Sequence, residues 1–225
     1  MNINKSQINV INKQFYNFSQ KTLKASHPET IYVISNLQKY ERNYKRIGMA
    51  EVFIQKAQQF AEDCFNKGLT DFTGIIYAFL IKIPNLDSEL RELIIKRAIQ
   101  IAQKQHDEIH ELARVVDLKK HYQNTKAPKK KYVETLFLEE NILKRLVRNF
   151  SDCSGNFKTV SREIKDKEVY EYRLGLAQVD ISKAFYKTDK KLALNKLKDA
   201  RKIFVNLNKN KEVFFTDGLI DQLKH

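Results

Sequence analysis

The sequence predicts an all-α fold, either an array of antiparallel helix pairs or an irregular helical bundle. Apolar residues recur at three- and four-residue spacing through most of the 225 residues, as on one face of a helix. Helix start and stop signals are frequent, whereas the alternation typical of strands is rare. Only six glycines and three prolines occur, too few for an all-β sandwich, which needs a turn signal every ~8–12 residues.

In the first half, the N-terminal 28 residues predict a helix with Ile8, Ile11, Phe15 and Phe18 on one face. We expect Gly48 and Gly68 to end the second and third helices, because glycine readily adopts the left-handed conformation that follows a helix. Further helices are expected to start at the caps Thr70 and Asp87. The helix between Thr70 and Pro84 is apolar nearly all round and is too short to cross a membrane, so it should be central and fully packed. The expected helices of this half are 29–46, 52–65, 70–83 and 87–105.

In the second half, a break is expected near His106 and Asp107, followed by a helix that ends at Tyr122. The polar stretch 123–131 contains Pro128 and predicts a basic linker or long loop. The expected domains are therefore an N-terminal helical region (1–122), this linker (123–131) and a C-terminal basic helical region (132–225), unless they form one continuous domain. Asp189 is expected to cap a helix. The expected helices after the linker are 132–150, 161–186, 189–208 and 211–224.

Small residues recur at a fixed place in the predicted helices. Ala57 and Ala61 precede Ala98 and Ala102 by 41 residues, and Ala193 and Ala200 resemble the same pattern. Small side chains let neighbouring helices approach closely, and a period of roughly 40 residues is in the range of paired-helix solenoids.

Two stretches resemble tetratricopeptide repeats. One runs from Ala98 through Leu112 and Ala113, like the junction between successive repeats; the other is the Leu174-Gly175-x-Ala177 step with Ala193 and Ala200 after it. The resemblance implies a right-handed TPR-like α-solenoid whose concave groove binds another protein or peptide. It transfers no ligand-binding residue, because the matching positions are packing positions. An irregular helical bundle remains the alternative.

The charge is strongly positive and uneven. The formal net charge is +14; residues 1–118 carry 16 basic and 13 acidic side chains (net +3), and residues 119–225 carry 25 and 14 (net +11). Such asymmetry points to an acidic partner, nucleic acid or an anionic surface, although solubility alone explains it equally well. Lysines can neutralise phosphates and tyrosine rings can stack on bases. The candidate residues for binding a nucleic acid or an acidic partner are Lys119, Lys120, Tyr122, Lys126, Lys129, Lys130, Lys131, Tyr132, Lys144, Arg145 and Arg148.

Two short patterns could carry chemistry. His106 and His110 have the four-residue spacing of a zinc-binding helix, but a helix break at His106 would separate them, so no metal site is predicted. Arg114 and His121 are similar to the Arg-x(4–6)-His motif of HEPN ribonucleases, in which both residues act on the scissile phosphate of RNA; that resemblance implies an RNA-cleaving dimer.

No phosphate-binding glycine loop or nucleophile elbow occurs in the sequence. We therefore expect a non-catalytic helical-repeat protein that mediates protein–protein interaction, without a cofactor. The alternative is a basic helical protein associated with RNA or DNA, and a HEPN-like ribonuclease comes after it.

The sequence also bears on location. No apolar run is long enough to span a bilayer. Cys64 and Cys153 form no paired motif, which fits a reducing compartment, and Cys64 is expected to be a small buried apolar residue. An intracellular, cytoplasmic protein is expected. The absence of acidic residues before Glu29 leaves organelle targeting open.

Overall fold

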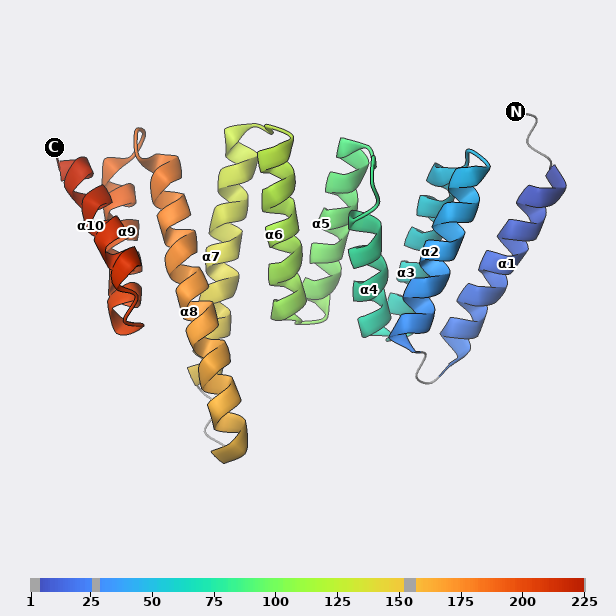
Figure 1. Cartoon of the computed structure of the whole chain (residues 1–225), viewed down its shortest axis with the longest axis horizontal. Coiled ribbons are helices and arrows are strands. Elements are labelled where there is room, and N and C mark those ends of the chain that lie inside the picture. Colours follow the sequence, from blue (N-terminus) through green and yellow to red (C-terminus); the bar gives the residue numbers. More distant parts are fainter. Residues whose placement is uncertain (1–4, 26–28, 152–156, 225) are drawn as a thin grey trace. The chain divides into compact units, whose positions relative to one another are not determined.

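The computed structural model describes residues 5–25, 29–151 and 157–224, which form helices joined by short links (Figure 1). No strand occurs among these residues, so the predicted all-α fold is confirmed. The ten helices of the described ranges are α1 (Lys5–Lys24), α2 (Thr30–Arg46), α3 (Ala50–Asn66), α4 (Thr70–Ile81), α5 (Ser88–Lys104), α6 (Glu108–Asn124), α7 (Lys129–Ser151), α8 (Phe157–Phe185), α9 (Lys190–Asn206) and α10 (Asn210–Lys224).

The chain divides into two compact units, Met1–His106 and Asp107–His225. The division differs from the boundary expected at 123–131: of that stretch only residues 125–128 are non-helical. The side chains on either side of this turn contact each other, which holds α6 and α7 together within one unit. The Gln123 amide donates to the Tyr132 hydroxyl over 3.0 Å, and the Lys131 ammonium lies 5.6 Å from the centre of the Tyr122 ring. The contacts of Gln123 with Tyr132 and of Lys131 with Tyr122 cannot be inferred from composition. The polar composition of the segment therefore predicts a linker.

Three links between helices share one geometry. Each consists of three residues, at 47–49, 67–69 and 207–209, and its middle residue is left-handed, with φ of 72° at Gly48, 74° at Gly68 and 53° at Asn208. The third residue of each link donates its backbone N–H to a carbonyl five residues earlier, over 2.8–2.9 Å. This is the hydrogen bond of a Schellman motif, and it confirms that the two glycines end their helices.

Side-chain caps begin several helices. The Asp87 carboxylate accepts hydrogen bonds from the backbone N–H groups of Glu89 and Leu90, and the Asp189 carboxylate accepts one from Leu192, so both predicted caps are confirmed. The predicted cap at Thr70 is wrong, because Leu69 occupies the cap position and Thr70 is the first helical residue. Between the helices expected at 132–150 and 161–186, residues 152–156, which include Cys153, lie outside the described residues. Residues 157–160 are helical, so α8 begins earlier than expected.

An aromatic cluster forms the N-terminal part of the first unit's core. The ring of Phe15 in α1 packs edge-on against the rings of Phe18, Tyr40, Tyr44, Phe53 and Phe60, with centroids 5.3–6.4 Å apart. Each tyrosine hydroxyl of the cluster has an acceptor: Tyr40 donates to the Gln14 carbonyl and Tyr44 to the Asn12 side chain. Helix α1 is therefore part of this core.

Helix α4 is central in the first unit, as its apolar sequence predicts. It contacts α2, α3 and α5, and its side chains Ile76, Tyr77 and Leu80 are buried. Cys64 in the neighbouring α3 is also fully buried, and burial raises the pKa of its thiol to about 12, as expected for an unreactive apolar residue.

In the second unit, α8, α9 and α10 share a core around Val179, Leu197, Phe204 and Ile220. Gly175 of α8 lies directly against Phe204 of α9: a Cβ atom added there would stand 2.6 Å from the ring. The alanines at 193 and 200 are completely buried on the same side of α9. Small residues thus allow α8 and α9 to pack closely. Among the described residues, no helix combines the length and apolarity needed to cross a membrane.

Candidate functional site

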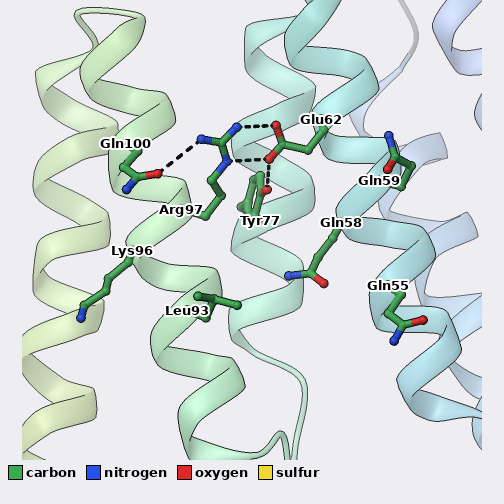
Figure 2. A pocket seen from close by; sticks show the side chains of 9 residues that line it. All are labelled: Gln55, Gln58, Gln59, Glu62, Tyr77, Leu93, Lys96, Arg97 and Gln100. Carbon is green, nitrogen blue, oxygen red and sulfur yellow. Dashed lines mark hydrogen bonds and ion pairs between the residues drawn. The ribbon is translucent and has the colours of Figure 1, made fainter.

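The first unit carries an open groove of about 570 Å³ between α3 and α5, with α4 beneath it (Figure 2). Helix α3 supplies four side chains at positions i, i+3, i+4 and i+7, which share one face of a helix, and α5 supplies four at the same spacing. Tyr77 of α4 also lines the groove. The eight helix-face residues are Gln55, Gln58, Gln59 and Glu62 from α3, and Leu93, Lys96, Arg97 and Gln100 from α5.

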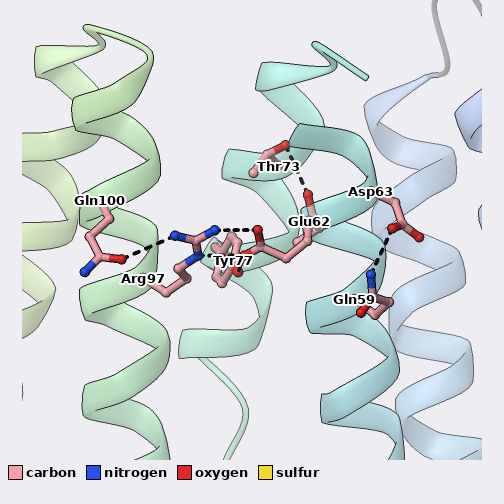
Figure 3. A network of polar contacts seen from close by, with 8 residues as sticks. Gln59, Glu62, Asp63, Thr73, Tyr77, Arg97 and Gln100 are labelled. Atoms are coloured by element: carbon pink, nitrogen blue, oxygen red, sulfur yellow. Dashed lines mark hydrogen bonds and ion pairs between the residues drawn. The ribbon is translucent and has the colours of Figure 1, made fainter. Parts of the chain in front are cut away.

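An ion pair crosses this groove. The Arg97 guanidinium donates two hydrogen bonds to the Glu62 carboxylate, from Nε over 2.8 Å and from Nη2 over 2.6 Å (Figure 3). The Tyr77 hydroxyl donates to the same carboxylate over 2.6 Å. These contacts tie α3, α4 and α5 together and fix the position of every charged atom at the centre of the groove.

The ionisation of this cluster follows from those contacts. The hydrogen bonds from Arg97 lower the pKa of Glu62 and outweigh its desolvation, while the same pair raises the pKa of the guanidinium. Burial, and then the hydrogen bond to Glu62, raises the pKa of the Tyr77 hydroxyl. At neutral pH the site therefore holds a carboxylate, a guanidinium and a neutral phenol.

The glutamines around the pair are less constrained. The Gln100 side-chain oxygen accepts a hydrogen bond from Arg97 over 3.3 Å, and the Gln59 amide donates to Asp63 over 2.9 Å. Neither Gln55 nor Gln58 has a hydrogen bond to another described side chain. Leu93, which is 62% exposed, adds an apolar surface at the groove. The groove thus combines a fixed ion pair with amides that can bind a ligand.

About half of the sequence-predicted basic residues are used inside the second unit. Lys119 pairs with Glu139 over 2.6 Å, Lys144 pairs with Glu140 over 2.9 Å, and the Arg145 guanidinium bridges Glu108 and Glu111. The two tyrosines are not available for stacking on bases: Tyr122 is 4% exposed, and Tyr132 is partly buried. Lys119, Tyr132 and Arg145 connect α6 to α7, and the Lys131 ammonium of α7 lies over the Tyr122 ring of α6. Lys144 pairs within its own helix.

The remaining predicted residues are exposed. Lys120, Lys126, Lys129 and Lys130 lie at or beside the α6–α7 turn, and Arg148 lies near the C-terminal end of α7. The structure therefore does not gather the eleven predicted residues into one surface. Only those at the turn form an accessible basic group.

Buried carboxylates explain where the other cations go. Glu140 is 1% exposed, and Lys196 of α9 donates to both of its oxygens over 2.6 and 2.7 Å. Burial would raise the pKa of Glu140, but the hydrogen bonds from Lys196 and Lys144 outweigh it and lower that pKa. Adjacent Glu139 and Glu140 are both buried, because α6, α8 and α9 cover this side of α7.

The two histidine patterns have local structural explanations. His106 lies at the helix break with a φ of 54°, and the His110 ring pairs with the Asp107 carboxylate over 2.5 Å. No cluster of three metal-binding side chains occurs among the residues that the structure describes. In the ribonuclease-like pattern, Arg114 pairs with Asp117 over 3.1 Å on its own helix, and His121 is buried beside Tyr122.

A second candidate groove, of about 630 Å³, lies in the second unit beside α8 and the link before α10. The Tyr172 hydroxyl donates to Glu212 over 2.9 Å, and the Lys209 ammonium lies 5.8 Å from the centre of the Tyr172 ring. These contacts join α8 to α10 and to the link that precedes α10.

Sequence reasoning missed the groove of the first unit. Its signal was present, because groove-lining side chains occur at i, i+3, i+4 and i+7 on both α3 and α5, the helices that hold the alanine pairs 41 residues apart. Glutamines carry no charge, so a search for clusters of charged residues does not identify them. Comparisons with protein-family models, with curated proteins and with solved structures found no significant match to this chain.

Proposed function

We propose that this chain is a non-catalytic helical-repeat protein, built like a tetratricopeptide array, that binds an extended segment of another protein in the groove of the first unit. The observation that carries the proposal is the set of three glutamines on α3 that line the groove beside the Glu62–Arg97 pair. The groove has a volume of about 570 Å³, which lies within the range of ligand-binding clefts.

The repeat period supports this proposal. Gln55 and Gln59 each precede a groove residue of α5, Lys96 and Gln100, by the same 41 residues that separate the alanine pairs. The alanines are buried in α3 and α5. Equivalent positions of two successive helix pairs therefore line one surface, as in solenoids that bind partners along a concave face.

The chemistry of the groove suits a main chain. A glutamine amide offers a donor and an acceptor side by side, which matches the N–H and C=O of a peptide group. Gln58 and Gln55 lie about one and two helical turns from Glu62 along α3 and can each make such contacts. Exposed Leu93 offers contact to an apolar side chain of the partner.

The ion pair supports binding rather than acid–base chemistry. Glu62 is the groove's one carboxylate, and it accepts hydrogen bonds from Arg97 and Tyr77. Its lowered pKa keeps it ionised at neutral pH, far from the value near 7 that a general acid or base needs. Its role in the proposal is to hold the two walls of the groove at a fixed separation.

The test is a selection of peptides from a library of random unstructured 12-residue peptides displayed on phage, followed by affinity measurement by fluorescence polarisation. We expect selected peptides to bind the intact protein and to lose at least tenfold in affinity to Q55A/Q58A, since each lost pair of hydrogen bonds is worth about 1 kcal/mol or more. Both glutamines are without a partner in the described chain, so the variant should fold normally.

The matched control is Q7A/Q38A, which removes exposed glutamines from α1 and α2, away from the groove. It should bind the selected peptides as the intact protein does. Failure to select any peptide, or equal affinity of the selected peptides for both variants, contradicts the proposed function.

A further inference from the structure

Two turns lie at the same end of the second unit. Helices α6 and α7 are antiparallel, since Gln123 contacts Tyr132 near one end and Asn149 contacts Glu108 near the other. Helices α7 and α8 are antiparallel too, with ring contacts between Phe137 and Phe185 and between Phe150 and Tyr170. The α6–α7 turn and the α8–α9 turn therefore project from one end, as Figure 1 shows for this unit.

These two turns carry exposed lysines, which we call the lysine edge: Lys126, Lys129 and Lys130 at the first turn, and Lys187, Lys190 and Lys191 at the second. None of the six has an ion pair with another described residue. The nearby Asp189 carboxylate is engaged as the cap of α9, where it accepts the Leu192 N–H over 2.9 Å. The unit therefore has lysines that pair inside it and lysines that are exposed, and six of the exposed lysines lie at this edge.

The positions of four of these lysines are unfavourable for the chain alone. Lys129 and Lys130 begin α7, and Lys190 and Lys191 begin α9, with no acidic residue in the first turn of either helix. A helix N-terminus carries partial positive charge, so it repels a cation placed there. By contrast, α3, α4, α5, α6 and α10 have acidic residues in their first turns. A bound polyanion would relieve this repulsion.

We infer that the lysine edge binds nucleic acid through its phosphate backbone. Six cations in two groups can neutralise successive phosphates and release their counterions. The tyrosines that could have stacked on bases are buried or held by neighbouring side chains, as described above, so base recognition has no aromatic surface here. Binding is therefore expected to be independent of sequence and steeply dependent on salt. This surface belongs to the second unit and is separate from the proposed peptide groove.

The experiment measures affinity for a fluorescent 20-nucleotide single-stranded RNA, and for a 20-base-pair DNA duplex, between 50 and 300 mM salt. The variants are K126A/K129A/K130A, K187A/K190A/K191A and the control K198A/K202A/K211A. All three remove the same charge, but the control lysines are exposed on α9 and α10, outside the two turns. Circular dichroism checks that each variant is helical.

We expect the intact protein to bind, with a slope of log affinity against log salt of about −4 for the single strand. Each turn variant should bind at least tenfold more weakly and reduce the magnitude of that slope by about 2, while the control leaves the slope unchanged. No binding at 50 mM salt would overturn the inference. So would an equal loss in the control, which would assign binding to net charge, or binding to phosphatidylserine vesicles without binding to either nucleic acid.

Discussion

Gly175 and Phe204 show how one missing side chain fixes a helix contact. The ring of Phe204 occupies the space that a Cβ at position 175 would need, and both residues are buried. The sequence singled out Gly175 through its place in the Leu-Gly step, but the ring that covers it could not be inferred, because position 204 is distant in the chain.

Gly175→Ala should lower the free energy of unfolding by about 1–3 kcal/mol, the usual cost of overpacking a core. Gly218→Ala is the matched comparison: Gly218 also lies within a helix, but no atom stands within 4 Å of an added Cβ. Alanine there should raise the stability by about 0.5–1 kcal/mol through helix propensity. Urea unfolding followed by circular dichroism measures both, and equal effects of the two substitutions would contradict the contact with Phe204.

The carboxyl of Glu140 should make stability depend on acid pH. Because its pKa is lowered in the folded protein, the stabilisation is present above the ordinary value of 4.5 and is lost as the pH falls below it. Glu140→Gln should cost about 1.5–3 kcal/mol at pH 7, since it weakens hydrogen bonds to charged Lys196. The variant should also lose less stability than the intact protein between pH 6 and pH 3 in urea unfolding. Parallel pH profiles for the two proteins would contradict this role.

At the scale of elements, the sequence predicted most helices because their ends are encoded locally. Asp87, Asp189, Gly48 and Gly68 act within four residues of their own positions, so caps and left-handed residues can be recognised in the sequence. The sequence predicted a linker or long loop at 123–131 but not that it is as short as the turn at 125–128, because that length depends on contacts between α6 and α7. The groove was missed for a related reason: its two walls belong to helices more than 30 residues apart.

Lys126 is left-handed at the end of α6, with a φ of 51°. A residue with a Cβ is strained in that conformation, whereas glycine is not. Lys126→Gly should therefore raise the free energy of unfolding by roughly 1 kcal/mol. Lys126→Ala, which removes the same charge but keeps the strain, should have little effect. A destabilised glycine variant in thermal unfolding would show that the strain is absent.

At the scale of the whole molecule, the two proposed surfaces rest on different helices. The groove is built by α3, α4 and α5, and the lysine edge by turns that join α6 to α7 and α8 to α9. The charge asymmetry of the sequence predicted which half carries the excess of cations. It could not predict which cations are free, because pairing with Glu108, Glu111, Glu139 and Glu140 depends on how the helices pack.

Substitutions at one surface should therefore leave the other unchanged. Q55A/Q58A should bind RNA with the affinity and salt slope of the intact protein, and K126A/K129A/K130A should bind the selected peptides normally. Fluorescence measurements of both ligands on all variants provide the test. A variant that impairs both activities would contradict the assignment of separate surfaces.

The length of the three links that share one geometry determines how the helix after each link is rotated about its axis. Each holds only three residues, and the next helix begins immediately after the third. An α-helix turns by about 100° per residue, so one inserted residue that extended the following helix would rotate its apolar stripe by that angle, away from the core. We therefore expect homologous chains to vary in the first and third side chains of 47–49, 67–69 and 207–209, but to keep glycine or asparagine at the middle position and to conserve the length of these segments.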